Sequence, residues 1–213
     1  MLTHACGMMA SNSAQELATL HAATHAKDVA TGIKQSNEDA TMTWDLCANL
    51  MMHLGADELN PGHAPAEVQA WLESLGLEIT FRRFMQWQWP QECGDLGAVH
   101  LYSSQRMMDE EDADLLAGHR LLCVGSAFNG DPLVLDYSTD LVAPCFVSHE
   151  EWWPDKSQDP RRCMARIAPS LTAFWWRQAE GLFVPIDSSS AGELNTLLAN
   201  EGREMRGPEG SPK

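Results

Sequence analysis

A chain of 213 residues, 44% of them hydrophobic, is long enough for one ordinary domain with extensions and apolar enough for a packed core. Its 14 basic and 30 acidic residues give a formal charge of −16, so the surface should repel nucleic acids and anionic membranes and attract basic partners. This charge argues against direct binding to DNA or RNA.

The start of the chain and the spacing of its cysteines predict a reduced, cytoplasmic protein. The first seven residues contain neither the basic region nor the apolar stretch of a secretory signal, and no segment is as long as a membrane span. The cysteines lack the close pairs of a zinc site. They are Cys6, Cys47, Cys93, Cys123, Cys145 and Cys163. We expect no metal, no cofactor and no membrane partner.

Residues 1–60 are predicted to form a helical extension that is partly mobile. Within it, residues 13–33 offer few apolar anchors for a helix. A more regular helix is predicted over residues 38–54, because leucines recur there at every fourth position and Gly55 follows as a stop.

The main domain is predicted over residues 61–187. Pro65 and Gly76 mark the two ends of a helix with one apolar face. Residues 77–89 mix helical and extended signals, and residues 97–102 alternate as in a strand.

Residues 109–116 predict a short helix with acidic residues at its positive N-terminal end, which is a favourable arrangement. One interpretation is an ordinary solvated helix start. The other is an electrostatic dock for a basic protein, such as a nuclease-type toxin. The acidic candidates for this contact are Asp109, Glu110, Glu111 and Asp112.

The strongest structural signal is a central antiparallel meander over about residues 120–147. Two turn signals separate three apolar, strand-forming runs, which are residues 121–124, 133–135 and 141–147. In the first turn, Asn129 and Gly130 both tolerate the positive φ of a tight hairpin. The second turn, which ends at Asp140, has a weaker signal.

The meander is followed by one more short strand at residues 164–167 and by a helix from Ser170 to about residue 180. Residues 188–213 are rich in Ser, Gly, Glu and Pro, so they are predicted to form a mobile C-terminal tail.

Two pairs of adjacent tryptophans need an explanation. Neighbouring side chains point about 100° apart on a helix and to opposite faces on a strand, so one member of each pair can reach the surface. Either a wide core buries both members, or one of them belongs to a contact patch for a partner. The candidates for such a patch are Trp152, Trp153 and Trp176, with Glu150 and Glu151 beside the first pair.

Three segments resemble the signature of the SUKH superfamily, the Smi/Knr-like domains. In that family a strand leads into a Gly-Asp-Pro turn and a second strand ends in Asp, as in residues 130–136 here. A third strand runs to a His-Glu pair, as in residues 143–150, and an aromatic helix follows a strand end, as in residues 167–174. The resemblance spans about residues 65–184, but residues 77–90 depart from the family pattern.

The resemblance implies an α+β fold with a mixed, largely antiparallel sheet and helices packed mainly on one face. It also implies a non-enzymatic role, because bacterial members are commonly immunity proteins that bind and neutralise a cognate polymorphic toxin. A regulatory or scaffold domain that binds a cellular protein is the alternative. The family motif gives structural roles to Gly130, Asp131, Pro132, Asp136 and His149.

A hydrolase that uses His149 and Glu150 is the least favoured hypothesis. Asp131 is better explained as a turn former, and Asp136 as a strand-end residue that accepts backbone N–H groups. Cys145 and His149 are four residues apart in an apparent strand, about 13 Å at 3.3 Å per residue, which is too far for a catalytic dyad. We therefore assign no catalytic and no metal-binding residue.

Overall fold

The computed structural model of the protein describes residues 37–200, apart from residues 55–58, 98, 139–140 and 183. Six strands form one sheet in chain order, and every pairing in it is antiparallel. The strands are β1 (Gly94–Leu96), β2 (Val99–Leu101), β3 (Leu121–Ala127), β4 (Pro132–Asp136), β5 (Ala143–Val147) and β6 (Met164–Arg166). The predicted α+β fold and its central meander are confirmed, and the described sheet is antiparallel rather than mixed.

The turn between β3 and β4 forms where the sequence predicts it, but only one of its residues takes a positive φ. Gly130 has φ 92°, and its N–H donates to the carbonyl of Ala127 over 3.0 Å. Asn129 instead uses its side chain, whose Oδ1 accepts the N–H of Asp131 over 3.0 Å. The turn thus combines a left-handed glycine with an Asx-type hydrogen bond.

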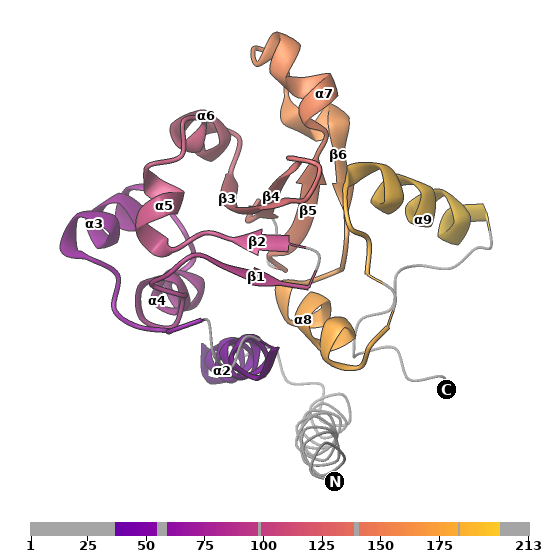
Figure 1. The fold of residues 1–213 in the computed structure, drawn as a ribbon. Coiled ribbons are helices and arrows are strands. Elements are labelled where there is room, and N and C mark those ends of the chain that lie inside the picture. The colour runs from indigo at the N-terminus through magenta and orange to yellow at the C-terminus, as the bar shows by residue number, and fades with distance from the viewer. Residues whose placement is uncertain (1–36, 55–58, 98, 139–140, 183, 201–213) are drawn as a thin grey trace, which may run out of the picture.

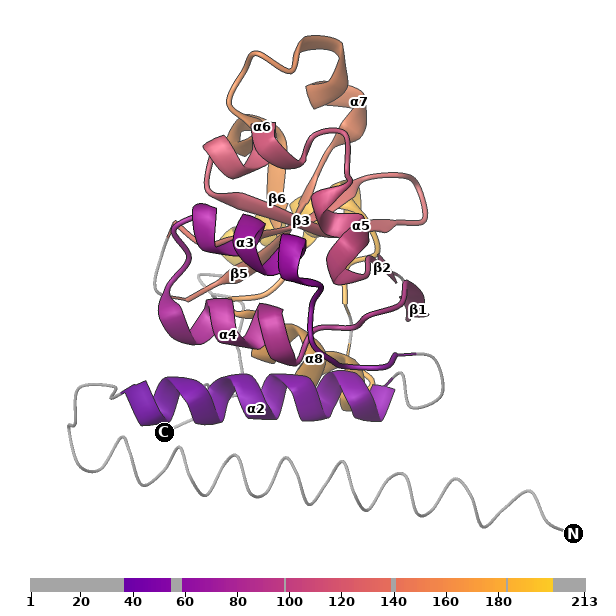
Figure 2. The same ribbon diagram turned by 90° about the vertical axis from the view of Figure 1, so that its left-hand side faces the viewer.

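Four helices share one hydrophobic core with one face of the sheet (Figures 1 and 2). These are α2 (Asn37–Leu54), α3 (Ala66–Ser74), α4 (Ile79–Trp87) and α8 (Leu171–Ala179). The largest side chains buried there are Phe81, Phe84, Trp89, Phe146, Phe174 and Trp175. Within residues 77–89, whose signals were mixed, Ile79–Trp87 form a helix, and the carboxylate of Glu78 caps it by accepting the N–H groups of Thr80 and Phe81.

A smaller core lies on the opposite face, under α6 (Ala113–Gly118) and α7 (His149–Trp152). Its members are Leu116, Leu121, Cys123, Val134, Cys145, Val147 and Trp152. Successive residues of the central strands therefore alternate between two buried faces, which explains their continuous apolar runs. The remaining short elements are α5 (Ser104–Met108), whose Met107 is buried in the main core, and the 3₁₀ turns η1 (Trp153–Asp155) and η2 (Pro160–Cys163).

The predicted domain limits do not match the described structure at either end. In α2, Cys47, Leu50 and Met51 are at most 2% exposed and belong to the main core, so this helix is part of the domain. The prediction of a mobile tail is wrong for α9 (Ser188–Asn200), a helix whose Ala191 is buried. The expectations for residues 13–33, for Asp140 and for residues 201–213 lie outside the described residues.

None of the helices in the described ranges has the length and hydropathy that crossing a membrane requires.

Candidate binding surface around Asp131

Three segments that are distant in sequence meet at the carboxylate of Asp131. Its Oδ1 accepts the backbone N–H of His149 over 3.0 Å and lies 2.7 Å from the Nδ1 of the same residue. Its Oδ2 accepts the backbone N–H of Ser188 over 2.8 Å and the side-chain amide of Asn129 over 2.9 Å. One carboxylate therefore ties the β3–β4 turn to the first residue of α7 and the first residue of α9.

The charge of Asp131 is stabilised although the residue is only 1% exposed. Burial acts to raise the pKa of the carboxyl, but hydrogen bonds from Asn129, Ser188 and His149 outweigh it and lower the pKa to about 2. A negative charge at the start of two helices is also favoured by the free N–H groups there. Asp131 is a structural centre, which extends the predicted role as a turn former.

Asp136 has the predicted strand-end role. Its Oδ1 accepts the backbone N–H of Ser138 and a guanidinium N–H of Arg161, each over 3.0 Å. Burial acts to raise the pKa of this carboxyl, and the bonds from Ser138 and Arg161 lower it overall. The residue fixes the end of β4 to η2.

His149 and Cys145 have different partners. The imidazole of His149 is oriented by Asp131 and packs on Trp153, with ring centroids 5.1 Å apart. The thiol of Cys145 lies in the smaller core and donates to the carbonyl of Ala143. Burial raises the pKa of this thiol to about 12, so it is not a nucleophile at neutral pH.

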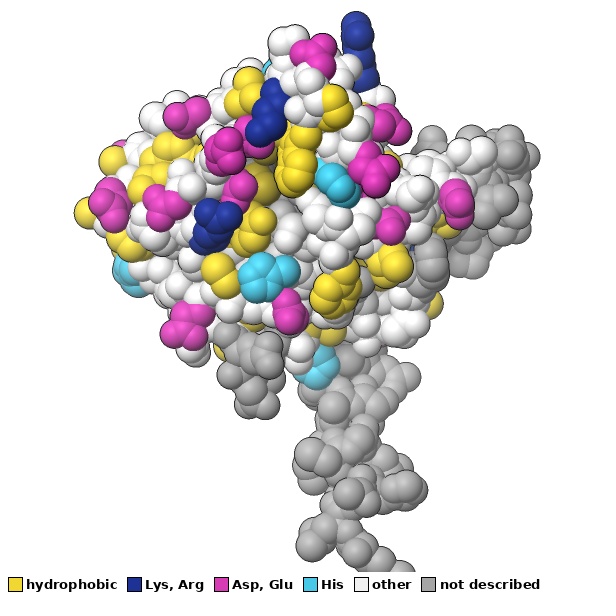
Figure 3. All heavy atoms as spheres, turned by 45° about the horizontal axis from the view of Figure 1, so that its top comes forward, with side chains coloured by type: hydrophobic (Ala, Val, Ile, Leu, Met, Phe, Trp, Pro, Cys, Tyr) yellow, Lys and Arg dark blue, Asp and Glu magenta, His cyan; other side chains and the backbone are white. Residues whose placement is uncertain are grey.

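Two large aromatic side chains are exposed next to this buried centre. Phe128, at the tip of the β3–β4 turn, is 77% exposed, and Trp153 is 49% exposed. On the face turned forward in Figure 3, hydrophobic, acidic and histidine side chains lie intermingled and basic ones are few. We call Phe128, His149, Glu150 and Trp153 the corner surface.

The other tryptophan candidates are not available to a partner in the same way. Trp152 is fully buried in the smaller core, which corrects its assignment to a contact patch. Trp176 is half-buried and packs against the main core, while its neighbour Trp175 is fully buried. One member of each pair thus lies nearer the surface, and only Trp153 is half exposed.

The acidic run lies mainly between α5 and α6, because α6 begins only at Ala113. Most of its carboxylates have internal partners. Glu110 pairs with Arg106 over 2.6 Å, Asp112 pairs with Lys156 over 2.7 Å, and Asp109 accepts from Gln105. Within the described part of the chain, Glu111 has no ion pair and is exposed. The Nζ of Lys156 also lies 5.9 Å from the ring centroid of Trp153, which places the acidic run beside the corner surface.

A hollow of about 460 Å³, which the sequence analysis did not anticipate, opens between α7 and α9. It is lined by Glu150 and Glu151 from α7, by Arg162 from η2, by Met164 from β6 and by Gly192 from α9, among others. No short-range pattern could have revealed it, because its walls come from four segments spread between Asn129 and Gly192.

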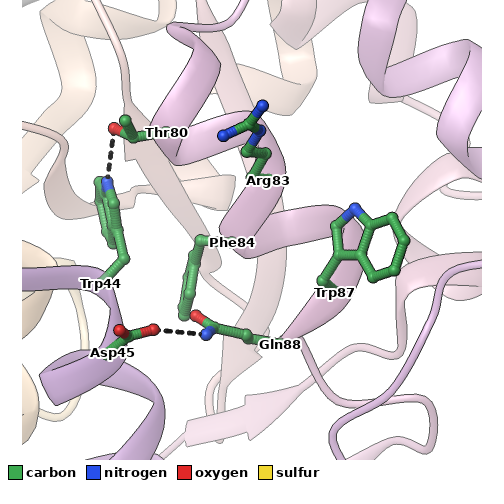
Figure 4. Close-up of a pocket in the computed structure, with 7 residues that line it drawn as sticks. All are labelled: Trp44, Asp45, Thr80, Arg83, Phe84, Trp87 and Gln88. Atoms are coloured by element: carbon green, nitrogen blue, oxygen red, sulfur yellow. Dashed lines mark hydrogen bonds between the residues drawn. The ribbon is translucent and has the colours of Figure 1, made fainter. Parts of the chain in front are cut away.

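A smaller hollow of about 110 Å³ lies between α2 and α4 (Figure 4). Its walls are tied to one another, since the indole N–H of Trp44 donates to Thr80 over 3.2 Å and the amide of Gln88 donates to Asp45 over 2.6 Å. The ring of Trp44 also stacks on Phe84 at 4.9 Å between centroids. These internal contacts are those of a helix–helix packing site.

Within the described ranges, no three His, Cys, Asp or Glu side chains are grouped so that they could hold a metal ion. Comparison of the chain with protein-family models, with curated proteins and with solved structures gave no match.

Proposed function

We propose that the protein is a SUKH-like immunity protein, a cytoplasmic and non-enzymatic domain that binds one cognate bacterial toxin and neutralises it. The observation that carries this proposal is the exposure of Phe128 and Trp153, at 77% and 49%, on the corner surface next to the hydrogen-bonded carboxylate of Asp131. Exposed aromatic side chains on a pre-organised surface are typical anchors of protein interfaces, where Trp in particular contributes much of the binding energy.

The charge of the protein favours a basic partner, such as a nuclease-type toxin. The formal charge is −16. In addition, Glu111, Glu150 and Glu151 are exposed and have no ion pair among the residues that the structure describes. Unpaired rim carboxylates steer a cationic partner towards the surface and suppress binding of acidic proteins. Trp153 would then hold the complex after the encounter.

The contacts of the reactive side chains support a non-enzymatic role. Both oxygens of Asp131 are occupied by donors from the fold, and Cys145 is a buried thiol with a pKa of about 12. A carboxylate that is fully used to hold three segments together is not free to move protons for a substrate.

The regulatory or scaffold alternative predicts the same surface with a cellular partner instead of a toxin. A hydrolase is the third candidate, because the 2.7 Å contact of Asp131 with Nδ1 of His149 resembles the orienting half of a catalytic triad. A hydrolytic activity that His149→Ala abolishes would support this third case, since an imidazole base would be essential for turnover.

Co-expression with the toxin encoded beside the gene tests the proposal. The wild-type protein should restore growth of cells that make the toxin, and a Phe128→Ser/Trp153→Ala double variant should protect them poorly. Ile79→Ala is the matched control, because Ile79 is a 45% exposed apolar residue on α4, away from α7 (Figure 1). Absence of binding between the two proteins at micromolar concentration would contradict the proposal.

A further inference from the structure

Strand β6 is one edge of the sheet, and its hydrogen bonds show which residues face outward. The carbonyl of Cys163 accepts from Ser148 over 2.8 Å, and the N–H of Ile167 donates to Pro144 over 3.0 Å. In an antiparallel ladder these pairs alternate with residues whose backbone groups point the other way. The N–H and C=O groups of Met164 and Arg166 therefore point away from β5.

These two outward residues differ in their partners. The carbonyl of Arg166 accepts the side-chain amide of Asn195 from α9 over 3.1 Å. Neither the N–H nor the C=O of Met164 has a hydrogen-bond partner in the described parts of the chain. A strand edge with a free donor and a free acceptor is a template for another extended segment.

Met164 lines the hollow of about 460 Å³ between α7 and α9, so there is room for such a segment. The α9 side of the hollow leaves open space, because a Cβ built on Gly192 would meet no atom within 4 Å. The contact of Asn195 with Arg166 limits the pairing to the Met164 end of the strand.

The charges around this hollow favour a cation. Glu150 and Glu151 line it and have no ion pair among the described residues, whereas the charge of Asp131 is taken up by donors from the fold. Arg162 is the cationic residue of the lining, so two available carboxylates face one guanidinium.

We propose that the hollow between α7 and α9 takes an extended, basic segment of the protein partner. The backbone of this segment exchanges two hydrogen bonds with Met164, and a Lys or Arg side chain lies against Glu150 and Glu151. The inference rests on the proposed role as a binding protein, and it adds the class of segment that is recognised and the strand that recognises it.

The test is an NMR titration of the full-length, ¹⁵N-labelled protein with two peptides. The basic probe is acetyl-Thr-Arg-Thr-Arg-Thr-amide, and the neutral probe has Gln in place of both Arg. The basic peptide should shift the backbone amide signal of Met164 saturably, and the neutral peptide should bind at least fivefold more weakly. No saturable shift at Met164, or equal binding of both peptides, would overturn the proposal.

Four variants make the test specific. Gly192→Leu fills the hollow and should abolish the shift, whereas Glu150→Gln/Glu151→Gln should weaken binding of the basic peptide at least fivefold. Arg162→Gln removes the opposing cation and should tighten that binding.

Glu180→Gln, an exposed acid at the end of α8, is the control and should leave binding unchanged. Equal peptide affinity of Gly192→Leu and wild type, with unchanged melting temperatures, would overturn the site.

The same variants separate this inference from the immunity function. If Gly192→Leu fails to bind the peptide but still protects cells from the toxin, the toxin does not use the hollow, and the inference fails while the immunity function stands. Peptide binding by a wild-type protein that gives no protection would support the site and point to a regulatory partner instead.

Discussion

At the scale of single residues, the carboxylate of Asp131 explains how the Gly-Asp-Pro turn is held to the first residues of helices α7 and α9. Its carboxylate holds the turn, His149 and Ser188 through bonds of 2.7 to 3.0 Å. Because the group is buried and ionised, removing its charge leaves N–H groups without an adequate acceptor, which is costly inside a protein.

Asp131→Asn should therefore lower the free energy of unfolding by about 2 to 3 kcal/mol, since an amide offers one acceptor oxygen where the carboxylate offers two. Urea denaturation measures this change. Asp155→Asn is the control, because Asp155 is exposed and its carboxylate bonds, among the described residues, only to nearby Ser157, so its loss should cost less than about 0.5 kcal/mol. Equal stability of Asp131→Asn and wild type would contradict the structural role.

The lowered pKa of Asp131 also predicts how stability depends on pH. The carboxyl titrates at about 2 in the folded protein and near its ordinary value of 3.8 when unfolded, so its contribution is fully present above about pH 4 and is lost as pH falls towards 2. The loss should amount to about 2 kcal/mol. Urea unfolding at several pH values should show a smaller decline in Asp131→Asn than in wild type; parallel declines would contradict this assignment.

At the scale of elements, the sequence predicted what local chemistry determines. The meander was predictable because turn formers separate three apolar runs. Helix α3 was predictable because Pro65 and Gly76 mark its two ends. Helix α9 was missed because its segment contains three serines, a glycine and two asparagines, which are weak helix formers. It forms because Ala191 is buried and because Asp131 accepts the N–H of Ser188, a contact across 57 residues.

Two glycines should respond in opposite ways to the same substitution. Gly130→Ala should destabilise the protein by about 1 to 2 kcal/mol, because φ 92° is unfavourable for a residue with a Cβ. Gly192→Ala should stabilise it by about 0.5 to 1 kcal/mol, because this glycine lies in a helix with open space around it. Melting temperatures of the two variants check the signs, and a shift in the same direction would contradict this account of the turn or of α9.

The candidate site was predictable in part. The sequence offers Glu150 and Trp153 as contact residues, and both are exposed in the structure. It could not reveal that Trp152 turns into the smaller core, that Lys156 neutralises Asp112, or that α9 closes one side of the hollow beside Met164. Each of these features depends on a contact between segments that are distant in sequence, and composition and periodicity carry no information about such contacts.

At the scale of the whole molecule, the main core is built from both ends of the described chain. Helix α2 contributes Cys47, Leu50 and Met51 to the main core, and α9 closes the sheet beside β6. A fragment of residues 61–187 should therefore lack a cooperative melting transition, whereas residues 37–200 should retain one. Circular dichroism during heating tests this, and a cooperative transition of the shorter fragment near that of the whole chain would contradict the role of α2 and α9 in the main core.

The most direct test of the binding role is the kinetics of the complex with the adjacent-gene toxin, measured by surface plasmon resonance. A wild-type complex should form at sub-micromolar concentration. Trp153→Ala should raise the dissociation rate constant about tenfold or more, and Glu111→Gln/Glu150→Gln/Glu151→Gln should mainly lower the association rate constant and its salt dependence. No binding by the wild type at micromolar concentration, or rate constants that neither variant changes, would contradict the account.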